Sequence, residues 1–330
     1  MITKFCAHTD LDGISWLVAL QYYFPELTES EIVIVDYKLF EQNKIDIDSL
    51  LDNCDKQIWI DFTPPVEVLQ KMIERKLEVL VFDHHKSSID KVTDILIGND
   101  NIATYFDIEN NNCGSMLFYN WCKQNSKLPV LPNLEYFINL VNVYDTWKCN
   151  DPLFERAVDL NRLLYKKMIF ELEGIDKYAP FLSTICESVF ETPMFEYSKL
   201  DKEIIEKDRN IEKTIMISCC RSIRFNVDSK GIPFGVVMIE KKMSIVAYRL
   251  LLKFSDRMKY LIIINTYKPD ELTMSLRSLK SSNFDVTTLE GVQGHAEAGG
   301  YKCESFIAVK RKAFLIWTKK INGLGYKISN

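Results

Sequence analysis

The feature that most constrains the fold is a series of four short apolar runs within the first 85 residues. The runs are ITKFCA, EIVIVDY, KQIWID and LEVLVFD, and helix-like segments such as GISWLVALQYYF and PVEVLQKMIERK lie between them. Nearly continuous hydrophobic strands are typical of a parallel sheet that helices bury on both faces. The sequence therefore predicts an α/β fold whose N-terminal part is built on a parallel sheet.

The rest of the chain divides into two further parts. Residues 113–213 show a mainly helical pattern, with CGSMLFYNWCKQ, PNLEYFINLVNVYDTW and SKLDKEIIEKDRNIEK as its clearest segments. The last of these has a narrow apolar stripe among charges, which indicates a solvated helix between two lobes. Apolar runs return in FGVVMIE, YLIIINTY and ELTMSLRS and predict a second, smaller α/β domain. We expect a first domain over 1–150, a helical connector over 151–213 and a second domain over 214–330.

Composition argues against several classes of protein. The net charge is −5 and no basic stripe is evident, which argues against a protein that grips long duplex nucleic acid. The nine cysteines include no C-x-x-C pair, so we expect reduced thiols in a cytoplasmic protein. We expect neither a signal peptide nor a membrane span, because no long apolar run occurs. No G-x-G-x-x-G follows the first run, which argues against an NAD-type dinucleotide-binding protein.

Acidic and imidazole side chains follow the apolar runs, where the strands should end. They are His8, Asp10 and Asp12 after the first run, Asp61 after the third, Asp83, His84 and His85 after the fourth, and Asp145 in a later helical segment. Ligands of open α/β sheets bind beyond the carboxyl ends of the strands, and neighbouring strands lie about 5 Å apart. Carboxylates this close resist ionisation unless cations neutralise them. The set suits borderline ions such as Mn²⁺, Fe or Zn and predicts two divalent ions, with Mn²⁺ favoured and Mg²⁺ or Co²⁺ possible.

Each of these residues also has an ordinary structural explanation when it is taken alone. The D-x-D-G stretch at Asp10 is common turn chemistry, and Asp61 could cap the helix that begins after TPP. Asp145 could be an ordinary helix acid. Their joint placement after successive strands favours a metal site over coincidence.

Several short motifs together resemble the DHH phosphoesterases. HTDLDG, DF at 61–62, DHH at 83–85 and YD at 144–145 match the four motifs of that family in order. MSLRS and the later GVQGHAEAGGY resemble the type 1 DHH-associated domain, whose signature is a Gly-Gly-His-x-x-Ala-x-Gly loop. The resemblance implies a DHH catalytic domain over 1–150 and a substrate-binding domain over 214–330. Gln293 stands where a glycine is common and Gly299 where an alanine is, which leaves the substrate preference open.

The resemblance assigns a role to each candidate residue. It implies that the metal ligands are His8, Asp10, Asp12, Asp61, His84 and Asp145, with Asp61 bridging two ions. Asp83 would orient a histidine, and His85 would face the scissile phosphate. The implied substrate contacts are Ser115, Arg277, Ser278, Gly294, His295, Gly299 and Gly300. Arg277 offers bidentate donors, and the glycines let backbone amides approach a phosphate. Ser115 has an equally good explanation as the N-cap of a helix.

The length and the two-domain layout most resemble the nanoRNase branch of the family. This implies a metal-dependent phosphodiesterase that hydrolyses short oligonucleotides as an exonuclease, by two-metal activation of water. The low net charge agrees with a short substrate, since affinity for long strands depends on many Lys and Arg contacts. The alternative is a phosphodiesterase or phosphatase acting on cyclic nucleotides, linear dinucleotides or 3′-phosphoadenosine 5′-phosphate. A non-catalytic nucleotide-binding protein is a third option, which the complete ligand set disfavours. A homodimer is left open.

Overall fold

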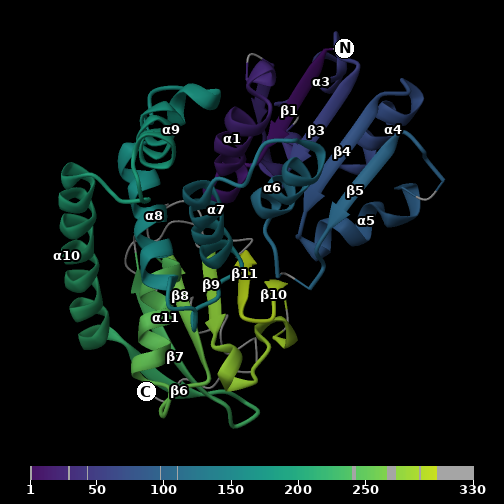
Figure 1. Cartoon of the computed structure of the whole chain (residues 1–330). Coiled ribbons are helices and arrows are strands. Elements are labelled where there is room, and N and C mark those ends of the chain that lie inside the picture. The colour runs from purple at the N-terminus through teal and green to yellow at the C-terminus, as the bar shows by residue number, and fades with distance from the viewer. Residues whose placement is uncertain are drawn as a thin grey trace. The chain divides into compact units, whose positions relative to one another are not determined.

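The chain divides into two compact units, Met1–Ile205 and Glu206–Asn330 (Figure 1). The computed structural model describes residues 2–28, 30–42, 44–96, 98–109, 111–239, 243–265, 273–289 and 291–302. The division falls within α10 (Lys199–Ser222), the helix predicted from the charged segment, and the boundary predicted near 213 lies in the same helix. Leu200 and Ile211 of α10 are 62% and 47% exposed, as expected of a solvated helix.

The first unit is built on a five-stranded parallel sheet with the strand order β2-β1-β3-β4-β5. The strands are β1 (Thr3–Ala7), β2 (Glu31–Ile34), β3 (Lys56–Ile60), β4 (Glu78–Asp83) and β5 (Ile102–Phe106). The four apolar runs form β1 to β4, so the predicted α/β fold with a parallel sheet is confirmed. The sequence pattern did not predict β5. This strand lies at the sheet edge and is only partly buried, so it carries no continuous apolar run.

Helices cover both faces of this sheet. On one face, α1 (Leu11–Tyr23) and α6 (Gly114–Asn125) meet through Trp16 and Phe118, whose ring centroids are 5.4 Å apart. Phe5 of β1 stacks on Trp16 from the sheet side. Successive strand residues point to opposite faces, so Cys6 belongs to the other core.

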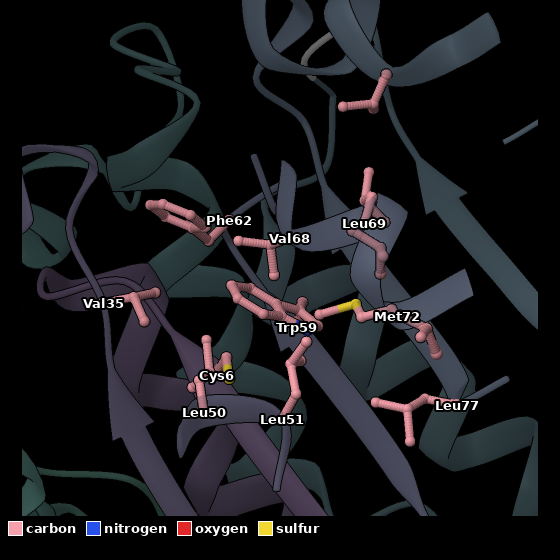
Figure 2. Packing of buried hydrophobic residues seen from close by; sticks show 13 residues of the cluster. Cys6, Val35, Leu50, Leu51, Trp59, Phe62, Val68, Leu69, Met72 and Leu77 are labelled. Atoms are coloured by element: carbon pink, nitrogen blue, oxygen red, sulfur yellow. The ribbon is translucent and has the colours of Figure 1, made fainter. Parts of the chain in front are cut away.

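The core on the second face surrounds Trp59, with Leu69 and Met72 beside it in Figure 2. It is covered by α3 (Ile47–Leu51), α4 (Val66–Glu74) and α5 (Lys86–Leu96). Strands buried from both sides hold the carboxyl edge of the sheet rigidly in place.

The first unit has further helices, and those after residue 113 belong to the predicted helical stretch. They are α2 (Tyr37–Glu41), α7 (Pro132–Asp145), α8 (Phe154–Lys167) and α9 (Ala179–Cys186), with the short turns η1 (Pro25–Leu27), η2 (Gly174–Tyr178) and η3 (Glu187–Glu191). None of the helices in the described parts of the chain has the length and apolar character that a membrane crossing requires. The eight cysteines among the described residues are free, and Cys303 lies outside them.

The second unit contains a six-stranded sheet in the order β10-β11-β9-β8-β7-β6. Its elements are β6 (Arg224–Val227), β7 (Pro233–Ile239), α11 (Met243–Lys253), β8 (Tyr260–Asn265), β9 (Thr273–Ser278), η4 (Lys280–Ser282), η5 (Val286–Thr288), β10 (Gln293–His295) and β11 (Ala298–Lys302). Only β7 and β8 run parallel among these described strands, and Phe234, Tyr260 and Ile262 lie in the core. The stretch expected to be a Gly-rich loop is instead a hairpin of β10 and β11. Residues 303–330 of the predicted second domain lie outside the described residues.

Candidate metal centre

Three neighbouring strands of the first unit end at the same level. Ala7 of β1 pairs with Ile60 of β3, and Ile60 pairs with Phe82 of β4. The residues that follow them are His8, Asp61 and Asp83. The chain leaves β1 for β2 on one side and then crosses to β3 on the other, so this edge is the switch point at which α/β sheets bind ligands.

Asp61 has the most unusual conformation at this edge. Its φ is 56°, in the left-handed region that residues other than glycine seldom adopt. Its amide donates to the carbonyl of Phe82 at 2.8 Å, and the residue is buried. A Cβ on Gly114 would lie 2.6 Å from the Asp61 nitrogen, so only a glycine lets α6 start at this point. Strained residues held in this way cluster at functional sites.

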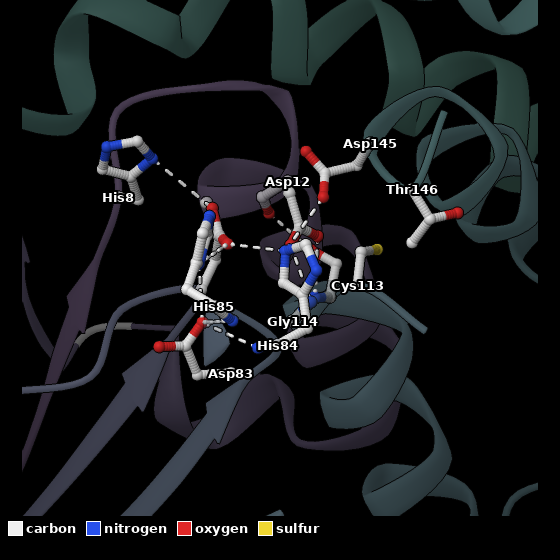
Figure 3. A network of polar contacts seen from close by, with 12 residues as sticks. His8, Asp12, Asp83, His84, His85, Cys113, Gly114, Asp145 and Thr146 are labelled. Carbon is white, nitrogen blue, oxygen red and sulfur yellow. Dashed lines mark hydrogen bonds and ion pairs between the residues drawn. The ribbon is translucent and has the colours of Figure 1, made fainter. Parts of the chain in front are cut away.

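The candidate ligands gather at this edge of the sheet, and Figure 3 labels four of them, His8, Asp12, His84 and Asp145. The first ligand group is His8, Asp10 and Asp61, and the second is Asp12, His84 and Asp145. A third combination, Asp61, Asp83, His84 and His85, overlaps both of them. Within each group, one ligand atom per residue lies within 4.8 Å of the others. Asp61 Oδ2 is 3.5 Å from His8 Nδ1, and Asp61 Oδ1 is 3.4 Å from His84 Nε2. The structure therefore brings together all six side chains that the sequence proposed as metal ligands, with Asp61 between the two groups.

The electrostatics of the cluster fit a bound cation. Burial and the charge of Asp10 raise the pKa of Asp61, and burial with the charge of Asp61 raises the pKa of Asp12. Burial opposes protonation of His8, yet the carboxylates of Asp10 and Asp61 outweigh it and raise its pKa to about 11. Both carboxylate oxygens of Asp61 are buried without a hydrogen-bond partner among the described residues. This oxygen-rich donor set with unpartnered acceptors suits divalent ions.

Asp83 and His85 form a pair beside the ligand groups. The Asp83 Oδ1 atom accepts from the backbone nitrogen of His84 at 2.7 Å and lies 2.8 Å from His85 Nδ1, while Oδ2 accepts from Thr63. Burial disfavours a charged His85, but Asp83 prevails and the His85 pKa rises to about 9. The His85 side chain is 32% exposed. Asp83 therefore fixes the ring of His85, and Thr63 is a contributor that the sequence did not reveal.

The beginning of α6 holds Asp12 in place. The backbone nitrogens of Gly114 and Ser115 donate to the two carboxylate oxygens of Asp12 at 2.7 and 2.8 Å. The Ser115 hydroxyl donates to the Asp12 carbonyl at 2.5 Å, and Ser115 is fully buried. Cys113, rather than Ser115, is the N-cap residue of α6. These contacts favour a structural role for Ser115 over the predicted contact with substrate.

In the second unit, the side chains of Arg277 and Ser278 contact the backbone. Arg277 on β9 donates to the carbonyl of Leu276 at 2.9 Å, and burial lowers the pKa of its guanidinium. The Ser278 hydroxyl donates to the carbonyl of Phe284 at 2.7 Å, so its hydrogen is already engaged within the unit. Arg277 is partly buried, and a single guanidinium retains further donors for a ligand.

The hairpin brings the remaining candidates of the second unit close to Arg277. The backbone register places His295, Ala298 and Arg277 in one row across β10, β11 and β9. Gly294 pairs with Gly299 in the next row, and Gly300 follows on β11. The side chain of His295 lies outside the described part of the structure, and the register fixes its backbone position alone.

Comparison with known proteins identifies the fold. No protein-family model matches the sequence, and no curated protein matches it either. A solved DHH domain, from a member of a family of ribosomal proteins, matches with a TM-score of 0.62 at 14% identity, over 99% of this chain and 87% of that chain. The fold is that of a DHH domain. CDC45 from Entamoeba histolytica has a similar fold, with a TM-score of 0.51 at 8% identity over 98% of this chain and 95% of that chain.

Proposed function

We propose that this chain is a DHH-type phosphodiesterase that uses two divalent cations, Mn²⁺ in the first place, to hydrolyse short oligonucleotides. The observation that carries the proposal is the Asp61 carboxylate, which is buried between the two ligand groups with both oxygens lacking a hydrogen-bond partner among the described residues. Burial of a carboxylate that receives no hydrogen bond costs several kcal/mol, by order of magnitude, and a bound cation offsets that cost. The DHH fold and the four motifs support the same assignment.

The two ligand groups divide the ions between them. His8 and Asp10 would hold one ion, Asp12, His84 and Asp145 would hold the other, and Asp61 would contact both. The ions, when bound, supply Lewis acidity toward water and toward the phosphate oxygens.

The pair of Asp83 and His85 gives the site a group for the substrate. Because Asp83 occupies Nδ1 of His85, Nε2 is the nitrogen free to meet a phosphate oxygen. A proton held at Nε2 stabilises negative charge that develops on the phosphate in the transition state. The partial exposure of His85 leaves its ring accessible to a substrate, whereas the buried His84 is suited to a metal.

The substrate class is proposed from charge and from the second unit. A net charge of −5 provides little sequence-independent attraction for a long polyanion, so a chain of few phosphates is the better match. Arg277, His295 and the glycines of the hairpin are proposed to bind the terminal nucleotide, with Arg277 as a planar donor to phosphate.

The decisive experiment compares three substrates with Mn²⁺: a five-nucleotide RNA, a cyclic dinucleotide and 3′-phosphoadenosine 5′-phosphate. Mass analysis of the products should show stepwise loss of mononucleotides from the RNA. Cleavage of the bisphosphate alone would make the protein a phosphatase and refute the nuclease proposal. Binding of two Mn²⁺ ions without turnover of any substrate would favour a non-catalytic nucleotide-binding protein.

A further inference from the structure

Asn142 is a buried amide close to the second ligand group, and no motif accounts for it. It lies on α7 one turn before Asp145 and is 3% exposed. Its Oδ1 accepts from the backbone nitrogen of Cys113 at 2.8 Å, and its Nδ2 donates to the carbonyl of Asn111 at 3.2 Å. One carboxamide thus joins α7 to the segment that leads into α6.

The connection continues from α6 to Asp12. Cys113 is the N-cap residue of α6, and the next two backbone nitrogens, of Gly114 and Ser115, donate to the Asp12 carboxylate. An unbroken series of short contacts therefore runs from α7, which carries Asp145, to Asp12. Both ends of the series are members of the second ligand group.

The end of α7 is fixed beside the same residue. The carbonyl of Asn142 accepts from the hydroxyl of Thr146 at 2.6 Å and from its backbone nitrogen at 3.1 Å. These bonds close the helix directly after Asp145, whose side chain lies 3.0 Å from His84 Nε2. The position of Asp145 thus depends on how α7 is attached around Asn142.

The first ligand group is held by different contacts. Asp10 lies 3.0 Å from His8 Nδ1 and accepts from the backbone nitrogen of Gly13 at 3.0 Å, both close to the end of β1. Neither contact involves α7. A change at Asn142 should therefore act mainly on the second group, through Asp12 and Asp145, because its one link to the first group is the packing of Gly114 against the Asp61 backbone.

We propose that Asn142 is a positioning residue that sets the separation of Asp12 and Asp145 and so controls the affinity of the second ligand group for its ion. This inference rests on the proposed function, because it assumes that the two groups bind divalent cations. Groups that orient metal ligands typically change metal affinity by about 10- to 100-fold when they are removed.

The test measures Mn²⁺ binding to metal-free full-length protein by calorimetry and compares Asn142→Ala with Asn133→Ala. Asn133 is a matched control on the same helix, since its amide also bridges backbone groups, accepting from Phe195 at 2.9 Å and donating to Thr192 at 2.9 Å. We expect two ions in the wild type and in Asn133→Ala. In Asn142→Ala, one ion should bind about 10- to 100-fold more weakly and the other within about twofold of the wild type.

Two further backgrounds identify which ion is affected. In Asp145→Ala, whose second group is already damaged, adding Asn142→Ala should leave the remaining Mn²⁺ affinity unchanged. Asp10→Ala removes a ligand of the first group. In this background, adding Asn142→Ala should lower the affinity for the remaining Mn²⁺ ion by the same factor as in the otherwise intact protein. This non-additive pattern is expected only of residues that act through the same ion.

The possible results separate this inference from the proposed function. Wild-type protein that binds no Mn²⁺ overturns both, while equal Mn²⁺ binding by the wild type and Asn142→Ala overturns the inference alone. An equal loss of affinity for both Mn²⁺ ions in Asn142→Ala also contradicts the inference. If Asn142→Ala does not fold, as judged by thermal unfolding, Asn142→Ser keeps a polar group at the position and carries the same expectation. Electron paramagnetic resonance should then show loss of the coupled Mn²⁺ pair.

Discussion

At the scale of the residue, Asp61 combines a costly backbone conformation with a costly charge. Its left-handed φ and its buried, unpartnered carboxylate, as seen among the described residues, both work against folding of the metal-free chain. Asparagine tolerates the same backbone region and removes the charge, which makes Asp61→Asn a cleaner substitution than Asp61→Ala. The residue therefore offers a direct test of whether the centre favours function at the expense of stability.

Asp61→Asn should abolish activity and raise the stability of the metal-free protein. Folding raises the pKa of Asp61, so its ionised form at neutral pH opposes folding, and removing that charge should raise the Tm of the metal-free protein. Turnover should fall by at least about 100-fold because the first ligand group loses an oxygen donor that also lies 3.4 Å from His84 of the second. Calorimetric unfolding and substrate turnover measure the two effects. A lower Tm in the metal-free state would contradict the first.

Mn²⁺ binding should release protons near neutral pH. In the metal-free protein the His8 pKa is raised to about 11, so this imidazole is protonated at pH 7, whereas a metal ligand must be neutral. The Mn²⁺ affinity should therefore rise as the pH increases from 6 toward 9 (an approximate range). Calorimetric titration in buffers of different ionisation enthalpy gives the number of protons released. A binding enthalpy that does not depend on the buffer would contradict the prediction.

The candidate ligands could be predicted from the sequence, but the residues that support them could not. His8, Asp61 and His84 stand at the ends of apolar runs, and that position is readable from the chain. Ser115 and Asp12 are 103 residues apart, and the bond between them exists only once α1 and α6 have packed together. Thr63 and Asn142 are likewise defined by contacts across elements. Local patterns carry no information about such partners.

At the scale of the element, the start of α6 organises the centre. It donates two backbone nitrogens to Asp12 and lies against the backbone of Asp61 without a side chain between them. A helix N-terminus is suited to an anionic partner, and in this protein that partner is a carboxylate of the chain itself. The same packing requires a glycine at position 114, and the local pattern of CGSMLFY does not indicate this requirement.

Gly114→Ala should destabilise the first unit and weaken metal binding. The added Cβ would lie 2.6 Å from the Asp61 nitrogen and 2.7 Å from its Cα, and backbone atoms cannot move aside cheaply. We expect a loss of about 1–3 kcal/mol in the free energy of unfolding, as for other overpacked sites. Gly300→Ala is the control for stability, because an added Cβ there meets nothing within 4 Å. Denaturant titration with and without Mn²⁺ measures both effects, and an unchanged midpoint would refute the packing argument.

Element prediction worked where a strand carries an apolar run, as the partly buried edge strand β2 also does, and failed where no such run occurs. The buried strands β1, β3 and β4 carry long apolar runs, which the sequence shows plainly. The edge strand β5 is mostly intermediate in burial and lacks that signal. The hairpin of β10 and β11 is rich in glycine, which suggests a loop until pairing with β9 is considered. Sheet edges depend on neighbours that the local sequence does not specify.

At the scale of the whole molecule, the two units should contribute separable functions. The ligand groups lie entirely in the first unit, and Arg277 with the hairpin lies in the second. Substitutions in the second unit should therefore change substrate affinity without changing metal binding. The DHH fold could be predicted from the motifs, and the predicted boundary at 213 falls in α10, the continuous helix within which the two units divide.

Arg277→Ala should raise KM for a short oligonucleotide by about 10- to 100-fold, as expected for loss of one or two hydrogen bonds to a charged phosphate. Its Mn²⁺ stoichiometry and affinity should equal those of the wild type. Arg221→Ala, at an exposed position in the same unit, controls for the loss of one positive charge. Steady-state kinetics and Mn²⁺ titration measure the two properties. Loss of Mn²⁺ binding in Arg277→Ala would contradict the separation of functions.

Because Asp61 lies between the two ligand groups, a substitution of this residue should affect both of them. A substitution of Asp10 or Asp145 changes one ligand group and leaves the donors of the other group in place. A substitution at Asp61 changes a carboxylate that lies 3.5 Å from His8 of the first group and 3.4 Å from His84 of the second, so it should affect both groups. Among the described candidate ligands, Asp61 is therefore a position at which a single substitution should weaken metal binding by both groups.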